Sequence, residues 1–595
     1  MHKRNVAQAV ADYLSRQLGI DTVFTVTGGG AMFLNDAFGN HDVINAVYNH
    51  HEQSSAMAAV GYAKARNDYG LACVTTGCGC TNALTGLLDA WQDNVPVIFV
   101  SGQVKLRDST GGTGLNIRQL GVQEANIIKM VESITKYAVL IDDPKKIRFE
   151  LEKAAWIAHS GRSGPVWIDI PQDIQGAPCD WYALEGFSPQ SENVQSIVVQ
   201  LAELKQKLSQ STRPLLLAGN GIRLSDQRNE FRLFAERLGI PCVFSYLSVD
   251  LLPSDHSLAI GRLGTKGDRA GNFAVQNADF LIVLGSRLSI SLTGFEYDKF
   301  AREAEIVVVD VDEVEHSKGT VSIDQLILTD LRDFFIEENL EAGDWSDWSA
   351  KCLSWKTNWP VYDPAYGGEA NVNMYEFAHK VPSIAQAKAH FVSDAGSAYY
   401  ISSQALQLER GQRYHTSGAQ ADMGFTLPAA IGVAFACPGE QVIGITGDGS
   451  FQMNLQELQL LVQHQPELKL CIWNNSGYLS IKATQKKFFN EKYAGTGQSS
   501  GLTFPSTEKL CAAYGLSYVR IETPQELDEL LSAAFNTKGP VIIEVICPEF
   551  QEVIPNVSAL KREDGSMVSK PLEDMYPFLE RDEFYSNMIV KPVVE

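Results

Sequence analysis

The sequence lacks long apolar runs, a net positive charge and paired cysteine motifs, and each absence excludes a class of protein. No apolar run approaches the ~20 residues that a helix needs to cross a membrane, so we expect no membrane span. The formal net charge is −22 at pH 7, which argues against nucleic acid or an anionic membrane as a partner. Cys78 and Cys80 have no second pair at zinc-ligand spacing, so we predict that the ten cysteines are reduced thiols. With no apolar signal core near Met1, these features favour a cytoplasmic location.

The length and the spacing of the apolar runs indicate several α/β domains. At 595 residues the chain suggests about three domains of ordinary size. Short runs rich in β-branched residues alternate with helical patterns, which is typical of doubly wound domains with mainly parallel sheets. We expect domains at residues 1–180, 195–340 and 371–560, a tail at 561–595, and polar linkers at 181–195 and 341–370.

Two polar turns follow neighbouring apolar runs in the expected third domain. Gly447, Asp448, Gly449 and Ser450 come after the run at 442–445, and a helical pattern follows them. A second run at 470–473 ends in a pair of asparagines at 474 and 475. In a parallel sheet both turns lie at the same carboxyl edge, where ligands bind. Carboxylate and amide oxygens suit Mg²⁺ or Ca²⁺ that carries a diphosphate, and a helix N-terminus suits the phosphates.

Taken singly, these turns have an ordinary alternative, because Asp-Gly turns and Asn-Asn loops are common in proteins. Their combination resembles the thiamin-diphosphate motif, and nearly the whole chain resembles thiamin-diphosphate-dependent enzymes of the acetohydroxyacid synthase-like branch. The resemblance implies that Asp448, the side chain of Asn475 and the main-chain carbonyl of Gly477 hold Mg²⁺. The residues that it places against the diphosphate are Gly447, Gly449 and Ser450.

A glutamate at a strand-to-helix junction is the second centre of the expected site. Glu52 follows a strand pattern at 43–48 and precedes a helical pattern rich in small residues. Locally, an acidic residue that interacts with the helix dipole in the first turn is a good alternative explanation. The resemblance implies instead that Glu52 hydrogen-bonds the pyrimidine ring of the cofactor and shuttles a proton there, a role that suits a buried carboxyl group.

Three further turns of the first domain resemble parts of the same pocket. Gly28 and Gly29 follow a strand pattern at 23–26, and a Gly-rich stretch at 77–82 ends at Asn82. That stretch is similar to the family's Gly-Pro-Gly-x-x-Asn sequence, with Cys78 where proline is usual. The segment at 121–124 resembles one that carries a substrate-side glutamine, so Gln123 is expected to face the reacting carbon.

The third domain carries the remaining residues that the resemblance assigns to thiamin diphosphate. Gly396 and Ser397 form a turn similar to the family's diphosphate-binding turn. Ala421 and Met423 precede a helical pattern rich in alanine, and Met423 is similar to the large apolar residue that forces the cofactor into a bent shape. A single methionine is more often ordinary core packing, so this assignment depends on the motif around it. Ile481 is expected to line the reacting face.

The central domain is predicted to contain a sheet similar to those of nucleotide-binding domains. Buried-strand patterns occur at 214–218, 280–284 and 306–309, but the turns lack Gly-x-Gly-x-x-Gly spacing. The resemblance implies FAD without a net redox role, and the alternative is a central domain that has lost its nucleotide. The residues expected to contact FAD are Arg287, Thr293, Gly294, Asp312 and Asp330.

Two departures from the family pattern concern the second substrate. Ser291 stands where the family has an arginine that binds the carboxylate of the acceptor 2-oxo acid, and an ion pair requires that charge. The tryptophan expected beyond Asn475 is also absent from residues 478–485. Both departures favour an uncharged or bulkier acceptor, such as a ketone or a keto-sugar.

We therefore expect a thiamin-diphosphate-dependent carboligase that decarboxylates pyruvate, or a similar 2-oxo acid, and transfers the acetyl unit to a ketone. Some relatives transfer it to nucleotide-linked keto-sugars in branched-sugar biosynthesis of the yersiniose type. The alternatives are acetolactate synthase, a thiamin-diphosphate-dependent decarboxylase or lyase, and a non-catalytic relative that acts as a regulatory subunit. In the family, the glutamate and the metal motif meet across a subunit interface, which implies a homodimer or homotetramer.

Overall fold

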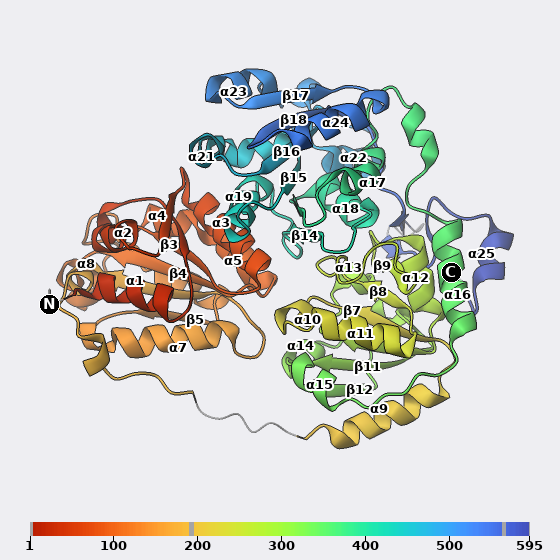
Figure 1. The fold of residues 1–595 in the computed structure, drawn as a ribbon, viewed down its shortest axis with the longest axis horizontal. Helices are drawn as coiled ribbons and strands as arrows, with labels where there is room; N and C mark the ends of the chain where they lie inside the picture. The colour runs from red at the N-terminus through yellow and green to blue at the C-terminus, as the bar shows by residue number, and fades with distance from the viewer. Residues whose placement is uncertain (1–3, 190–195, 562–566, 594–595) are drawn as a thin grey trace.

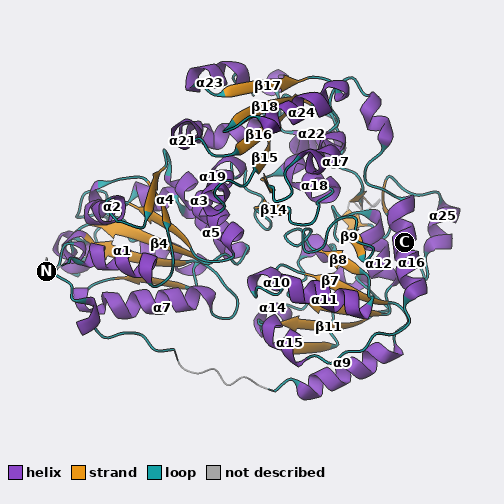
Figure 2. Ribbon diagram, viewed as in Figure 1, coloured by secondary structure: helices purple, strands orange, loops and turns teal. Residues whose placement is uncertain are grey.

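The computed structural model describes residues 4–189, 196–561 and 567–593. It contains three six-stranded sheets, all of whose strand pairs are parallel. Helices flank each sheet in Figures 1 and 2. The expected fold class, three α/β domains with mainly parallel sheets, is therefore confirmed. No helix in the described ranges is both long and apolar enough to cross a membrane.

The N-terminal sheet has the strand order β2-β1-β3-β4-β6-β5. Its strands are β1 (Thr22–Thr25), β2 (Asn45–Tyr48), β3 (Gly70–Val74), β4 (Val97–Gln103), β5 (Tyr137–Leu140) and β6 (Val166–Pro171). On one face pack α1 (Val6–Arg16), α2 (Met32–Gly39) and α7 (Ile147–His159). On the other pack α3 (Glu52–Arg66) and α5 (Leu84–Gln92).

The central sheet has the order β12-β11-β10-β7-β8-β9. Its strands are β7 (Pro214–Ala218), β8 (Cys242–Phe244), β9 (Ala259–Arg262), β10 (Phe280–Leu284), β11 (Glu305–Asp310) and β12 (Gln325–Leu328). The main helices around it are α9 (Val198–Gln210), α11 (Arg228–Leu238), α12 (Arg269–Asn277), α15 (Leu331–Glu337) and α16 (Ser346–Asn358).

The third sheet has the order β14-β13-β15-β16-β18-β17. Its strands are β13 (His390–Ser393), β14 (Arg413–Thr416), β15 (Val442–Gly447), β16 (Leu468–Asn474), β17 (Ser517–Ile521) and β18 (Val541–Ile546). On one face pack α17 (Met374–Ile384), α18 (Gly396–Ala405) and α24 (Leu527–Asn536). On the other pack α19 (Thr426–Ala436), α21 (Leu458–His464) and α23 (Thr507–Tyr514).

The strand order predicts where a ligand would bind in each domain. Central strands such as Phe280–Leu284 are apolar and fully buried because helices cover both sheet faces. The order of the strands reverses between β1 and β3, between β7 and β10, and between β13 and β15. Ligands of doubly wound sheets bind at such switch points, beyond the carboxyl ends of the strands. The turns singled out from the sequence follow these same strands.

A close helix crossing joins the first and third domains into one apolar core. An added Cβ at Gly61 of α3 would lie 2.3 Å from the carbonyl oxygen of Ala429, and one at Gly432 of α19 would lie 2.0 Å from that of Ala58. The two backbones therefore touch, and glycine at both positions permits the contact. The surrounding core contains side chains of both sheets.

Two local expectations differ from the structure, and the structure also places the described part of the tail. The region at 341–370 is not wholly a linker, because residues 346–358 form α16, whose Trp348 and Trp355 are buried in the central core. The helical pattern after the Gly-Asp-Gly turn breaks at Asn454, whose φ and ψ of −135° and 27° interrupt the helix. The described part of the tail packs on α12, where Asn272 Nδ2 donates to the carbonyl oxygen of Leu572 at 3.0 Å. The linker expected at 181–195 lies partly outside the described residues.

Candidate active site

The predicted metal ligands lie beyond two adjacent strands. β15 pairs with β16, with Gly447 opposite Trp473, so Asp448 and Asn475 follow the same edge of the sheet. Asp448 begins α20 (Asp448–Phe451), where its Oδ1 accepts from the backbone N–H of Gly449 at 2.8 Å. Its Oδ2 accepts from the N–H of Gly477 at 3.1 Å. Burial raises the pKa of Asp448 to about 6, a desolvation penalty that a bound cation would offset.

The neighbouring donor groups fit a divalent cation that carries a diphosphate. Asn475 is 4% exposed, and its Nδ2 has no hydrogen-bond partner in the described part of the chain. Gly477 has a φ of 149°, and an added Cβ there would lie 2.0 Å from the carbonyl oxygen of Thr496. This backbone requires glycine. A carboxylate, an amide oxygen and a main-chain carbonyl form the oxygen-rich set that Mg²⁺ or Ca²⁺ prefers.

Asp394 connects the turn at 447–450, called the metal turn here because it holds the predicted ligand Asp448, to the expected diphosphate turn at 396–397. Its Oδ2 accepts from Ser450 Oγ at 2.6 Å and from Thr446 Oγ1 at 2.7 Å, so this carboxylate joins the end of β13 to the β15–α20 turn. α18 begins immediately after it with Gly396, whose φ is 57°, and Ser397. The N-terminus of this ten-residue helix has backbone N–H groups of the kind that suit a phosphate. Sequence reasoning noted this stretch but did not assign Asp394 a role; its position directly after a buried strand is the signal.

The segment that carries Met423 is held against the metal turn. The backbone N–H of Gly424 donates to Ser450 Oγ at 2.8 Å, and its carbonyl oxygen accepts from Asn454 Nδ2 at 2.9 Å. Ala421 has a φ of 54°, which marks a tight bend just before Met423. Met423 itself is half-buried. The interruption of the helix at Asn454 thus lets its side-chain amide bond the backbone next to Met423.

Glu52 lies in the first domain, where α3 begins. It is 9% exposed, and its Oε2 accepts from Asn82 Nδ2 at 2.9 Å. An added Cβ at Gly79 would lie 3.2 Å from Oε1, so the glycine leaves room beside that oxygen. The predicted pair Glu52 and Asn82 is therefore brought together at the switch point of the first sheet.

The other predicted residues of the first domain lie near the turn at 77–82, which carries Asn82. Gly28 approaches Thr75 so closely that an added Cβ would lie 2.4 Å from the threonine Cβ. Gly29 accepts a hydrogen bond from Gln172 at 2.6 Å. The carbonyl oxygen of Gln123 would lie 2.2 Å from a Cβ added at Gly77, while its side chain is exposed. Gln123 thus sits beside the turn at 77–82 that carries Asn82.

Buried polar contacts position Glu52 relative to the third domain. Ser54 Oγ donates to Asn454 Oδ1 at 2.9 Å, and Asn49 Nδ2 donates to Glu457 Oε2 at 3.0 Å. The backbone N–H of residue 50 donates to Oε1 of the same Glu457 at 3.0 Å. Within one chain, therefore, the residues around Glu52 contact the segment that follows the metal turn.

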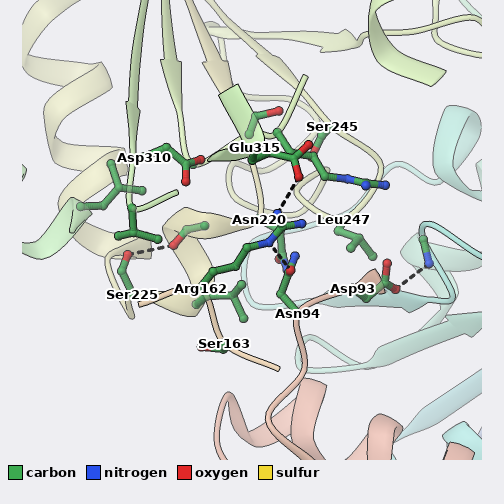
Figure 3. A pocket seen from close by; sticks show the side chains of 18 of the residues that line it. Asp93, Asn94, Arg162, Ser163, Asn220, Ser225, Ser245, Leu247, Asp310 and Glu315 are labelled. Atoms are coloured by element: carbon green, nitrogen blue, oxygen red, sulfur yellow. Dashed lines mark hydrogen bonds and ion pairs between the residues drawn. The ribbon is translucent and has the colours of Figure 1, made fainter. Parts of the chain in front are cut away.

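A cavity of about 420 Å³ lies beyond the switch point of the central sheet, between the first and central domains. In Figure 3, Arg162 reaches from the first domain between Asn94 and Glu315. Its Nε donates to Asn94 Oδ1 at 2.6 Å, and its Nη1 to Glu315 Oε2 at 2.6 Å and to Asp312 Oδ2 at 3.0 Å. Burial raises the pKa of Asp312, but hydrogen bonds from the backbone N–H of Glu315 and from Arg162 outweigh this effect and lower that pKa. Arg162 could not be singled out from local sequence patterns, because its two carboxylate partners, Asp312 and Glu315, lie 150 and 153 residues further along the chain.

The residues expected at FAD divide between this cavity and its border. Arg287 and Asp330 line the cavity, next to the close turn at Gly285. Asp312 caps α14 (Glu313–His316) and pairs with Arg162 at the border. Thr293 is buried, and Gly294, with a φ of 81°, would place an added Cβ 3.5 Å from Leu572. A cavity of this size at the switch point of a doubly wound sheet would hold part of a dinucleotide, while Gly294 faces Leu572 of the tail.

The chain matches three family descriptions along most of its length. Residues 4–130 match the thiamine pyrophosphate enzyme N-terminal TPP binding domain. Residues 201–337 match the thiamine pyrophosphate enzyme central domain, and residues 394–545 match the C-terminal TPP binding domain. The three matches correspond to the three sheets.

Curated relatives cover nearly the whole chain. The acetolactate synthase large subunit of Lactococcus lactis subsp. lactis (strain IL1403) is 32% identical over 554 residues, which is 91% of this chain and 93% of the relative. The acetolactate synthase isozyme 2 large subunit of Escherichia coli (strain K12) is 30% identical over 556 residues, covering 93% and 97%. The chloroplastic acetolactate synthase of Arabidopsis thaliana is 30% identical over 577 residues, covering 93% and 83%.

Proposed function

The chain belongs to the thiamin-diphosphate-dependent, acetolactate synthase-like family of enzymes, and we propose that it joins the acetyl unit of pyruvate, or of a similar 2-oxo acid, to a ketone acceptor. The domains and relatives establish a thiamin-diphosphate-dependent enzyme that forms carbon–carbon bonds. The observation that supports the ketone acceptor is Ser291, which lines the central cavity without the charge that an acceptor carboxylate requires.

The third domain is proposed to hold the cofactor through its diphosphate. Asp448, the Asn475 amide and the Gly477 carbonyl would hold Mg²⁺, while Ser450 and the N-terminus of α18 would bind the phosphates. When bound, thiamin diphosphate supplies an electron sink for the loss of CO₂ from the donor. Met423 would support the cofactor from beneath, and Ile481, which is 48% exposed on α22 (Leu479–Phe488), would border the reacting substrates.

The first domain is proposed to supply the proton transfer. Glu52 would hold a proton and pass it to the pyrimidine ring through Oε1, the oxygen that faces Gly79. Asn82 fixes the other oxygen at 2.9 Å and so orients the carboxyl group. Gln123, exposed beside the same turn, would contact the substrate. Because family members combine these halves from two subunits, we expect a homodimer or homotetramer.

FAD is proposed as a structural cofactor of the central domain. Arg287 would meet its phosphates and Asp330 its adenosine half, since both line the cavity at the β7–β10 switch point. Asp312 would contribute only after a change at its ion pair with Arg162. A flavin spectrum released from denatured protein would support this assignment.

Acetolactate synthesis is the second candidate, because the relatives that cover nearly the whole chain carry that name. It requires that another residue replace the missing arginine at position 291. A simple decarboxylase or lyase would release the acetyl unit as an aldehyde without an acceptor. The presence of Glu52, Asp448 and Asn475 disfavours a non-catalytic regulatory subunit.

Mass spectrometry of products tests the proposal. Purified protein would be incubated with pyruvate, thiamin diphosphate and Mg²⁺, with and without a panel of ketones that includes nucleotide-linked keto-sugars. We expect adducts of the ketones that are larger by one acetyl unit. Efficient acetolactate formation from pyruvate alone would instead support the second candidate. Absence of CO₂ release would contradict both.

A further inference from the structure

Three cationic side chains lie near α18, which follows the expected diphosphate turn, and α22, which carries Ile481. Arg262 ends β9, Lys266 lies in the loop before α12, and Lys487 lies near the end of α22. Within the described ranges, no ion pair involves any of the three. We propose that this cationic group binds the diphosphate of a nucleotide-linked ketose acceptor, an assignment that rests on the proposed carboligase function.

Lys266 is the centre of this cationic group. Its Nζ lies 5.8 Å from the centroid of the Tyr400 ring, and Tyr400 is one turn beyond Ser397 in α18. Burial, Lys487 and Arg262 together lower the pKa of Lys266 to about 8. Like charges and burial both disfavour an ammonium group, and an anion would reverse both effects. A bound anion would therefore stabilise the charged form of Lys266.

Arg262 shows the same deficit of acceptors. It is 2% exposed, and its Nε and Nη2 lack hydrogen-bond partners among the described residues. Its Nη1 donates to Ser403 Oγ and, at 3.4 Å, to the carbonyl oxygen of Tyr400. The nearby carboxylate of Asp268 accepts instead from the backbone N–H groups of Arg262 and Gly271, both at 2.6 Å. The guanidinium also lies over the Tyr246 ring, 4.3 Å from its centroid. A ring face does not replace hydrogen-bond acceptors, and an anion would satisfy the two remaining donors.

The cationic group adjoins the position where the family has its arginine. The backbone N–H of Thr265 donates to the carbonyl oxygen of Ser291 at 2.9 Å, and its Oγ1 contacts the same oxygen at 3.3 Å. Lys266 is the next residue in the chain. The positive charge absent from position 291 is thus supplied by a neighbouring loop, from a different direction.

The placement of the charges favours a diphosphate over a carboxylate. In a 2-oxo acid the carboxylate is bonded directly to the reacting carbonyl carbon. Lys487 is six residues beyond Ile481 in α22, or about 9 Å along the helix axis. A diphosphate several bonds from the ketone of a sugar matches this offset better. Lysine binds phosphate as a point charge, and the orphaned guanidinium of Arg262 adds directional donors.

Variants at position 266 test the assignment in the enzyme loaded with thiamin diphosphate and Mg²⁺. For Lys266→Met we expect KM for a nucleotide-linked ketose to rise about tenfold, the effect of losing one charged contact. KM for a small uncharged ketone should change far less, and Lys266→Arg should retain low KM for the charged acceptor. Lys538→Met, at an exposed position before β18, is the matched control and should behave as the wild type.

Direct binding separates this inference from the proposed reaction. By calorimetry we expect UDP to bind the wild-type holoenzyme and Lys538→Met, and to bind Lys266→Met about tenfold more weakly. Equal UDP affinity in Lys266→Met and wild type would overturn the inference even if the carboligase reaction is found. A rise in KM confined to 2-oxo acid acceptors would also overturn it, because the anion would then be a carboxylate. Absence of CO₂ release with normal UDP binding would refute the proposed reaction alone.

Discussion

At the crossing of α3 and α19, packing and helix propensity predict opposite effects of one substitution on the free energy of unfolding. Gly432 lies inside α19, where alanine would by propensity alone stabilise the helix by about 1 kcal/mol. An added Cβ would, however, lie 2.0 Å from the carbonyl oxygen of Ala58, whereas ordinary contacts begin at 3.4 Å. The two backbones would have to separate within a close-packed core, and overpacking of this kind costs about 1–3 kcal/mol, occasionally more.

We therefore expect Gly432→Ala to lower the free energy of unfolding by about 1–3 kcal/mol. Urea unfolding should show a lower midpoint at an unchanged m-value. Gly61→Ala should act in the same direction, since its Cβ would lie 2.3 Å from the carbonyl oxygen of Ala429. Turnover should fall as well, because the displaced helix α3 begins at Glu52.

Gly368→Ala is the matched control. Its backbone needs no positive φ, and an added Cβ would meet no heavy atom of the described residues within 4 Å. Its effect should stay within about 0.5 kcal/mol, as for most surface substitutions. If Gly432→Ala instead raised the urea midpoint as helix propensity predicts, the close approach of α3 and α19 would be refuted.

Three further predictions concern the site. Glu52→Gln should lower turnover about 10²- to 10⁴-fold, because general acid–base catalysis is lost, while calorimetry should still detect thiamin diphosphate binding. Asp448→Asn should weaken Mg²⁺-dependent cofactor binding about tenfold or more in the same assay, since it removes the charged oxygen ligand. The pKa of Lys266 is lowered from 10.5 to about 8 in the folded protein. Between these two pH values the unfolded chain binds more protons than the folded one, so the free energy of unfolding should rise with pH there. Lys266→Met should remove that rise in pH-dependent unfolding, and in the wild type KM for a charged acceptor should increase above about pH 8.

Much of the fold follows from local patterns in the sequence. The run Phe280–Leu284 is continuously apolar because helices cover both faces of its sheet, so its burial is visible without coordinates. The Gly-Asp-Gly turn is likewise recognisable, since its residue types follow from the chemistry of a metal and a diphosphate. These features depend on neighbours in sequence or on a strand period, which is why they were predictable.

Other features depend on distant partners and were not predictable. The polar character of residues 341–370 predicts a linker, but Trp348 and Trp355 of α16 are buried in the central core, where Trp348 donates to the carbonyl oxygen of Pro214, 134 residues earlier. The helix break at Asn454 reflects its contacts with Ser54 and Gly424, which lie in other segments. Arg162 likewise depends on distant partners, because its ion pairs with Asp312 and Glu315 form only where the first domain contacts the central one.

The missing arginine and the unpaired cations are two aspects of one electrostatic arrangement. The chain carries a net charge of −22, so an anionic acceptor meets an unfavourable long-range field and needs local positive charge to bind. Lys266 and Arg262 provide that charge at a cost, since burial lowers the pKa of one and leaves two donors of the other unsatisfied. An arginine at position 291 would add a further like charge beside this loop, because Thr265 bonds the backbone of Ser291. Under the proposed assignment the two arrangements are therefore alternatives, with serine at position 291 where Lys266 binds the charge of the acceptor.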